Sequence, residues 1–248
     1  MGNSAVKKHV DTASKTGVLN LSKSRLNEFP SNLKAIQHTL RNIDLSQNQI
    51  SSIPNYIENF SALKCLTLNN NKIDRIPDEI GNLKKLEVLS LESNRIKNIP
   101  TTISALENLK CVRLSENMLS YFPLIFCGMK HLDSLDLSKN MITEIPDGVS
   151  SLHVSELNLN QNQISILSNE LSQCPRLKIL RLEENCLSLS SITPSLLRDS
   201  QITNLSVQGN LFDMKAFMEL EGYEAYMERF TAVKKNCTNS SIVHHNEK

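Results

Sequence analysis

The chain of 248 residues contains no tryptophan, and aromatic residues make up only 4% of it. A hydrophobic core therefore has to be built from aliphatic side chains, and hydrophobic residues, at 40%, are plentiful enough for one. Long apolar runs are absent as well. Neither the first twenty residues nor any later stretch resembles a signal peptide or a membrane span. These absences predict a cytosolic protein with an aliphatic core.

An excess of charge of one sign is also lacking. The 27 basic and 26 acidic residues leave a formal net charge of +1. Proteins that bind DNA or RNA carry a basic patch or stripe that attracts the phosphates. The even balance therefore argues against a nucleic-acid partner.

The cysteines form no recognisable motif. They are scattered along the chain without a CxxC pair, and in a cytosolic protein we expect them to be reduced thiols. The set is Cys65, Cys111, Cys127, Cys174, Cys186 and Cys237.

Motifs that carry catalysis are missing too. The sequence has no phosphate-binding loop and no GxGxxG, HExxH or GxSxG motif. Its six histidines fall at irregular positions, so they predict no metal site. We therefore expect a protein that is not an enzyme and that needs neither a cofactor nor a metal ion.

A repeat is the strongest feature that is present. The segments 40–50, 63–73 and 86–96 all fit the pattern LxxLxLxxNxL. The asparagines of this pattern recur every 22 to 25 residues, and a first, degenerate copy has Ser24 in place of asparagine. Nine coils in one register predict a solenoid of stacked repeats. The asparagine ladder consists of Asn48, Asn71, Asn94, Asn117, Asn140, Asn162, Asn185 and Asn210.

Each position of the repeat has a physical reason. The LxL segment predicts a short strand whose leucines point inward and whose other side chains point outward. The asparagine amide has donors and an acceptor for buried backbone groups of its own and the neighbouring coil. A proline follows an apolar residue in six coils, as in Ile76-Pro77, and precedes a segment suited to a short helix or 3₁₀ turn. The fold class is therefore α/β, a curved solenoid with a parallel sheet on its concave face and short helical turns on its convex face.

The ends of the chain depart from the repeat. We expect a leader at residues 1–16, repeats at 17–212, a C-terminal cap at 213–236 and a disordered tail at 237–248. Coils seven to nine lack the proline, and the longer stretch around Pro194 is expected to bulge. The cap is predicted to be helical, because it has an apolar stripe that can cover the open end of the core. The stripe consists of Phe217, Leu220, Tyr223, Met227 and Phe230.

These coils resemble the intracellular leucine-rich-repeat family, and the proline-bearing 23-residue coil is similar to that of Ras-binding scaffold proteins. The resemblance of the repeats covers residues 17 to about 212. The whole chain is a closer match to one member of this family, which it resembles in the Met-Gly-Asn-Ser-Ala start, the coils with Gln-Asn-Gln-Ile and Arg-Leu-Glu-Glu-Asn-Cys-Leu, and the end with Tyr-Met-Glu-Arg-Phe-Thr-Ala. The resemblance implies a solenoid with a myristoylated amino terminus and no assigned catalytic activity. It does not supply a partner.

The amino terminus is the second informative feature. Removal of Met1 would expose Gly2 for myristoylation, although Val6 departs from the usual M-G-x-x-x-[ST] motif. The alternative is an ordinary unmodified leader. A single myristoyl chain binds membranes with a partition constant on the order of 10⁴ M⁻¹. Lys7 and Lys8 would each add about 1 kcal/mol near an acidic leaflet, so we expect reversible membrane association through a lipid anchor.

The outward strand positions predict where a protein partner binds. They form a polar stripe across the coils, and concave surfaces are the usual binding faces of solenoids. Arg113 is expected beside Asp136, and Arg181 near Glu156. The alternative is that these charges only neutralise one another on a solvated sheet. The candidate contact residues are Asp44, Thr67, Ser90, Glu92, Arg113, Asp136, Glu156, Asn158, Arg181 and Glu183.

Two functions fit this surface. The first is a monomeric, membrane-proximal scaffold or adaptor that docks an unidentified protein, such as a small GTPase by analogy with related scaffolds. The second is a regulatory subunit of a signalling enzyme such as a phosphatase. Both would use the same face, so the sequence does not separate them.

Overall fold

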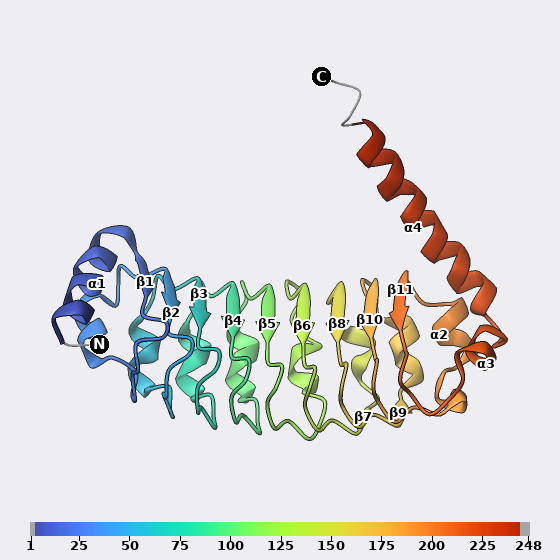
Figure 1. Ribbon diagram of the computed structural model, residues 1–248, viewed down its shortest axis with the longest axis horizontal. Helices are drawn as coiled ribbons and strands as arrows, with labels where there is room; N and C mark the ends of the chain where they lie inside the picture. The colour runs from blue at the N-terminus through green and yellow to red at the C-terminus, as the bar shows by residue number, and fades with distance from the viewer. Residues whose placement is uncertain (1–2, 244–248) are drawn as a thin grey trace.

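The computed structural model describes the backbone of residues 3–243 and the side chains of residues 8–235. Nine short strands form one parallel sheet in which each strand pairs with the next coil along the chain (Figure 1). The predicted leucine-rich-repeat solenoid is confirmed. The strands are β1 (Val18–Asn20), β2 (Asn42–Asp44), β3 (Cys65–Thr67), β4 (Val88–Ser90), β5 (Cys111–Arg113), β6 (Ser134–Asp136), β8 (Glu156–Asn158), β10 (Ile179–Arg181) and β11 (Asn204–Ser206).

The interior of the solenoid is a stack of aliphatic side chains. Neighbouring strands are in strict register, so that Leu66 pairs with Leu89 and Leu89 with Val112. All three side chains are fully buried. Because identical positions stack on one another, each coil buries its apolar side chains only with the help of its neighbours.

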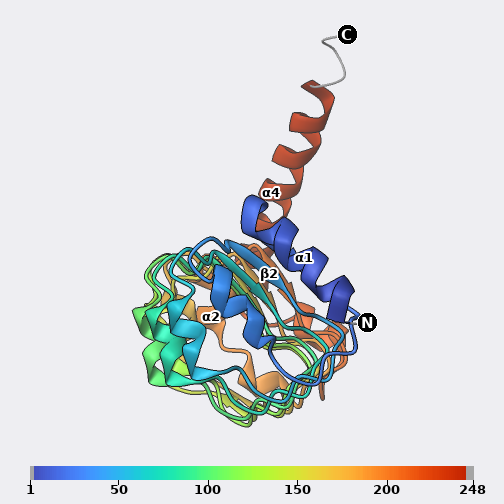
Figure 2. The same ribbon diagram turned by 90° about the vertical axis from the view of Figure 1, so that its left-hand side faces the viewer.

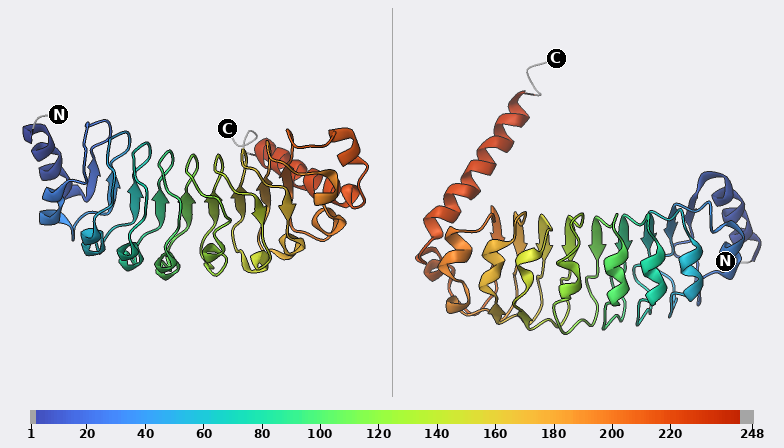
Figure 3. Two further views of the ribbon diagram at one scale, coloured as in Figure 1. Left: turned by 90° about the horizontal axis from the view of Figure 1, so that it is seen from below. Right: turned by 180° about the vertical axis from the view of Figure 1, so that it is seen from behind.

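Short 3₁₀ helices cover the convex side, as predicted, and Figure 3 shows them opposite the strands. Several begin directly after the repeat proline, whose φ near −70° suits a helix start, as at Pro77 with φ −72°. The helices are η1 (Ser31–Ile36), η2 (Asn55–Asn59), η3 (Asp78–Asn82), η4 (Thr101–Ala105), η5 (Leu124–Phe126), η6 (Val149–Ser151), η7 (Asn169–Gln173) and η8 (Leu189–Ser191).

The packing of these helices differs along the stack, and two glycines make the difference testable. A Cβ atom on Gly81 would lie 2.5 Å from the carbonyl oxygen of Thr102, whereas a Cβ on Gly128 would have no neighbour within 4 Å. We expect Gly81→Ala to lower the free energy of unfolding by about 1–3 kcal/mol, because the clash is with backbone. Gly128→Ala should change it by less than about 0.5 kcal/mol. Urea denaturation of both variants tests this, and equal losses would contradict the packing described.

The ladder asparagines join neighbouring coils. Asn117 Nδ2 donates to the carbonyl oxygens of Leu91 in the preceding coil and Leu114 in its own, at 2.9 and 3.0 Å. Its Oδ1 accepts from the Ile96 amide at 3.0 Å. The Leu91 carbonyl also accepts from Asn94, so that one carbonyl serves two asparagines. The result is a continuous line of hydrogen bonds through the buried turn.

The residue before each ladder position has a left-handed backbone, with φ between 53° and 56° in eight coils and glycine in the ninth. Side-chain-bearing residues rarely adopt this conformation. The asparagine hydrogen bonds on one side and the strand on the other hold the turn in place. The positions are Lys23, Gln47, Asn70, Ser93, Glu116, Lys139, Gln161, Glu184 and Gly209.

Helices cover both ends of the stack. Residues 3–16, where no element was predicted, form helix α1 (Asn3–Thr16), which lies across the N-terminal end in Figure 2 and buries Ala13. The bulge expected around Pro194 is helix α2 (Pro194–Arg198), with Thr193 as N-cap. Its capping side chain accepts a hydrogen bond from the Leu196 amide.

The predicted C-terminal cap consists of α3 (Met214–Met218) and α4 (Tyr223–Val243). Helix α4 continues past residue 236, where we expected the cap to end, and extends away from the stack (Figure 1). The Tyr226 hydroxyl accepts a hydrogen bond from the Leu205 amide at 3.1 Å. It therefore pairs with the last strand where a tenth coil would otherwise lie.

Candidate functional site: the concave face

Three rows of side chains point outward from the sheet. The pairing of the strands places equivalent residues of neighbouring coils directly beside one another, about 4.8 Å apart. The first row is Val18, Asn42, Cys65, Val88, Cys111, Ser134, Glu156, Ile179 and Asn204. The second row is Asn20, Asp44, Thr67, Ser90, Arg113, Asp136, Asn158, Arg181 and Ser206. The third row is Ser22, Ser46, Asn69, Glu92, Ser115, Ser138, Asn160, Glu183 and Gln208.

One polar cluster surrounds Glu92. Asn69 Nδ2 donates to Glu92 Oε2 at 3.3 Å, and Asn69 Oδ1 accepts from the Glu92 amide at 2.9 Å. Arg113 Nε lies 3.8 Å from Glu92 Oε1. The sequence placed Arg113 beside Asp136, and the strands do pair these two residues. The prediction that they are neighbours is therefore confirmed, but the alternative that the two charges neutralise each other is not what the structure shows, because Asp136 accepts from the amide and hydroxyl of Ser138 while Arg113 pairs with Glu92.

A second cluster lies around Glu183. Asn160 Nδ2 donates to Glu183 Oε2 at 2.6 Å, and Asn160 Oδ1 accepts from the Glu183 amide at 2.8 Å. Arg181 donates to the Glu156 carboxylate, the diagonal neighbour that the sequence indicated. Both clusters therefore share an asparagine that fixes the glutamate of the next coil, but only in the first does an arginine pair with that glutamate, because Arg181 pairs with Glu156 instead.

Further charged side chains lie near the two ends of the strands, just before a strand begins or just after it ends. Glu87 accepts from Lys110 at 2.8 Å and from Lys64 at 2.9 Å, and these hydrogen bonds lower its pKa to about 2. After the C-terminal end of β5, hydrogen bonds from Lys139 and Ser93 lower the pKa of Glu116. Both carboxyl groups are thus held in their charged form. A general acid needs the opposite shift.

The candidate contact residues are exposed to different degrees. Most are half-buried by their neighbours and keep polar atoms at the surface, and Arg113 is exposed. The prediction that Ser90 contacts a partner is wrong, because the residue is only 2% exposed and its hydroxyl donates to Asn69 Oδ1 at 2.9 Å. The small side chain lies beneath its larger neighbours, so we remove Ser90 from the residues that a partner can touch.

Two thiols belong to the first row. Cys65 and Cys111 are half-buried, with Val88 between them. Burial raises the pKa of Cys111, although Arg113 opposes the shift. Since the thiolate is the reactive form, Cys111 is a poor nucleophile at neutral pH.

The predicted lipidation site, Gly2, and the side chain of Lys7 lie outside the described residues. Lys8 is exposed on α1. Within the part of the chain that is described, no helix is long and apolar enough to cross a membrane.

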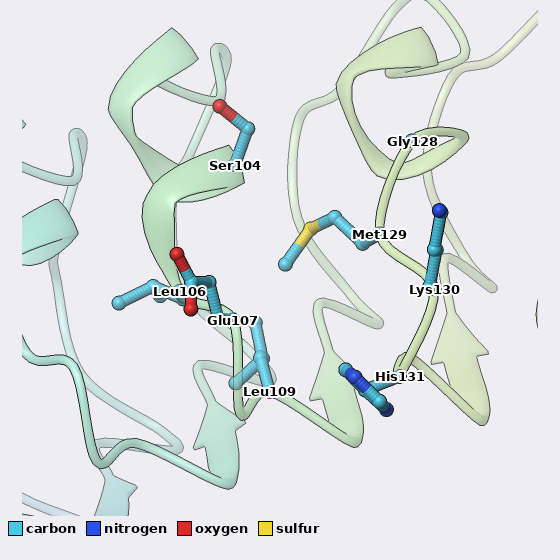
Figure 4. Close-up of a pocket in the computed structure, with 8 residues that line it drawn as sticks. All are labelled: Ser104, Leu106, Glu107, Leu109, Gly128, Met129, Lys130 and His131. Atoms are coloured by element: carbon cyan, nitrogen blue, oxygen red, sulfur yellow. The ribbon is translucent and has the colours of Figure 1, made fainter.

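Sequence reasoning missed a hollow on the convex side. It lies between η4 and the segment 128–131, where Met129 points toward Leu106 (Figure 4). Leu106, Leu109 and Met129 form its apolar floor, and Glu107 and Lys130 are among the residues at its rim. The open space beside Gly128 gives it room. The only signal in the sequence is this glycine, which stands where the three preceding coils have Asn59, Asn82 and Ala105.

The sequence matches two family models. One, described as a leucine-rich repeat region, matches residues 32–144, and the other, described as leucine rich repeat, matches residues 130–187. Together they span most of the nine coils.

Solved structures of similar proteins agree with this. A leucine-rich-repeat protein of Leptospira interrogans has 27% identity and a TM-score of 0.71, with 82% of this chain and 52% of that one covered. The chain thus spans about half the length of that relative. The repeat ectodomain of the plant receptor kinase GASSHO1/SCHENGEN3 from Arabidopsis thaliana has 29% identity and a TM-score of 0.58, with coverage of 74% and 23%. Internalin C2 of Listeria monocytogenes shares the fold at 19% identity, a TM-score of 0.67 and coverage of 82% and 92%. The chain therefore has the leucine-rich-repeat fold, with matches to models of this repeat over residues 32–187.

Proposed function

We propose that this protein is a non-catalytic scaffold or adaptor that binds a protein partner on its concave face and associates reversibly with a membrane through a myristoyl group on Gly2. The observation that supports partner binding on the concave face is the pair of clusters around Glu92 and Glu183. They place arginine, glutamate and asparagine side chains in fixed positions on an open, rigid sheet.

The fold supports protein recognition. Leucine-rich-repeat domains generally mediate protein–protein interaction, and the Arabidopsis receptor ectodomain was solved in complex with Casparian strip integrity factor 2. The charge pairs of the concave face are partly exposed, and ion pairs at the surface add little to stability. They can therefore exchange their partners within the sheet for partners on a bound protein at small cost. Complementary charges would then set specificity and association rate.

Reversal of two concave charges tests the binding face. Arg113→Glu together with Arg181→Glu should reduce the amount of partner recovered in a pulldown at least tenfold, because both glutamates would face Glu92 and Glu156 and repel acidic groups of a partner. The melting temperature should change little. The matched control is Lys85→Glu with Lys215→Glu, which makes the same charge change at two exposed sites outside the three rows. Equal recovery with both double variants would move the interface away from the concave face.

The membrane half of the proposal rests on the Gly2 motif and on Lys7 and Lys8. Mass spectrometry of the N-terminal peptide from cells should find myristate on Gly2, and an unmodified or acetylated glycine would end this half. Proximity labelling with wild type and Gly2→Ala then separates the two functions. Loss of membrane signalling proteins in the variant supports an adaptor, whereas one stoichiometric enzyme in both samples supports a regulatory subunit.

A further inference from the structure

The side of the solenoid that follows the asparagine ladder is a second ordered surface. We call it the lateral face, and define it as the exposed side chains one, three, four and seven positions after the ladder asparagine in coils three to seven. Its coils are in register, since the Met118 amide donates to the Ile96 carbonyl at 2.9 Å and the Met141 amide to the Leu119 carbonyl at 2.8 Å. Strands β7 (Glu144–Ile145) and β9 (Ile166–Leu167) pair on this side, at the lower edge of Figure 1.

Large apolar side chains gather on the lateral face. Nine large hydrophobic side chains are exposed on the described part of the chain, and five of them lie here in coils five to seven. Ile166 is 58% exposed and Tyr121 44%. Exposed apolar side chains gathered on one face in this way mark an interaction site more often than isolated exposed residues do. The patch consists of Met118, Tyr121, Leu124, Met141 and Ile166.

Basic side chains lie beside the apolar patch, in coils three and four. Lys72, Arg75, Arg95 and Lys97 are exposed, and none of them forms an ion pair with another described residue. The arginines of the concave face contrast with them, because Arg113 and Arg181 each have a glutamate partner. Asp74 and Asp78 balance the charges of Lys72 and Arg75 in coil three, so the lateral face has an excess of positive charge in coil four, next to exposed apolar surface.

An acidic side chain lies on the other side of the patch centre. Glu144 is exposed, pairs in register with Ile166 through the backbone, and makes no ion pair with a described residue. Along the stack, the lateral face thus has mixed charge in coil three, is basic in coil four and apolar in coil five, and is apolar and acidic in coils six and seven.

We infer that the lateral face binds a peptide segment of a partner protein, with acidic residues at one end, apolar anchor residues in the middle and a basic residue at the other end. The acidic end would face Arg75 and Arg95, the anchors Met118 and Tyr121, and the basic residue Glu144. Methionine side chains adapt their shape to varied apolar partners, which suits an anchor site. This surface is distinct from the concave face of the proposed function.

The charge pattern favours a peptide over a lipid surface. An anionic membrane would be repelled by Glu144 within the patch and by the exposed carboxylates of Asp74 and Asp78 among the basic residues. A second copy of the chain is the competing occupant. In an isologous dimer the apolar patches would meet around a twofold axis, which would bring the basic coil four of each copy to the acidic coil six of the other. The sedimentation experiment below distinguishes this assembly from peptide binding.

A random 16-residue peptide library displayed on phage and selected on the intact protein tests the inference. Enriched peptides should carry an acidic cluster followed or preceded by apolar residues. Their affinity should fall at least tenfold for Met118→Glu with Ile166→Glu, and likewise for Arg75→Glu with Arg95→Glu. The matched controls are Met218→Glu with Val233→Glu, which are exposed apolar residues of the cap, and Lys85→Glu with Lys215→Glu. Both controls should bind normally.

Five outcomes would overturn the inference. The library could yield no enriched peptides, or peptides without acidic and apolar clusters. Enriched peptides could lose binding only to the concave variant Arg113→Glu with Arg181→Glu. Vesicles with phosphatidylserine could bind the unacylated protein and release it when Met118 and Ile166 are replaced, which would assign the surface to lipid. Sedimentation could show a dimer that the same replacement dissociates, which would assign it to self-association.

Discussion

Asn117→Ala should lower the free energy of unfolding by about 2–3 kcal/mol, because it leaves the buried Ile96 amide without a hydrogen-bond acceptor. The carbonyl groups of Leu91 and Leu114 lose one donor each but keep another, from Asn94 and Asn140. The loss of stability therefore comes mainly from the unpaired amide of Ile96. Equilibrium denaturation gives the loss, and hydrogen exchange of the Ile96 amide locates it.

Asn98→Ala is the matched control for this variant. Asn98 is an exposed asparagine of the preceding coil, and its side chain accepts only from the Tyr121 hydroxyl, at 3.2 Å. We expect a change below about 0.5 kcal/mol. If the two alanine variants lost the same free energy of unfolding, the hydrogen bonds of the ladder asparagine would contribute no more to stability than those of an exposed asparagine.

Tyr226→Ala should have a still larger effect, a loss of about 3–5 kcal/mol, which is typical for removal of a buried aromatic ring. Tyr226 is 6% exposed and packs against Tyr223 and Phe230, with ring centroids 6.0 and 6.1 Å apart. Its loss opens the C-terminal end of the aliphatic core. Denaturation followed by circular dichroism measures the loss.

Tyr226→Phe separates the ring from the hydroxyl. The ring and its packing remain, but the Leu205 amide loses its acceptor. We expect a loss of about 1–2 kcal/mol. A phenylalanine variant as unstable as the alanine variant would show that the cap depends on the hydrogen bond rather than on covering the core.

The sequence predicted the stack well because its signal is repeated. Each of the nine strands has the same inward positions, so one misread coil would be corrected by its neighbours. The same periodicity predicted the three outward rows. It did not predict the ion-pair partner of Arg113. This long side chain has a carboxylate on each side, Glu92 and Asp136, and it pairs with Glu92 while Asp136 accepts hydrogen bonds from Ser138.

Features that occur once were harder to predict. Helix α1 has few apolar residues and depends on contacts of Val10 and Ala13 with the core, since isolated short helices are marginal in water. The burial of Ser90 depends on the larger side chains around it rather than on serine itself. The lateral apolar patch could have been found, because Met118 and Met141 follow ladder asparagines where earlier coils have lysine and arginine.

The native thiols offer the most direct test that a partner occupies the concave sheet. Cys65 and Cys111 belong to the first row, whereas Cys186 is exposed one position after a ladder asparagine in coil eight. Alkylation rates of the three thiols would be measured by mass spectrometry with and without saturating partner from the pulldown. We expect bound partner to slow alkylation of Cys111, and of Cys65 if it reaches that coil, while Cys186 reacts unchanged. Protection of Cys186 alone, or unchanged rates at all three sites, would contradict recognition by the outward rows of the sheet.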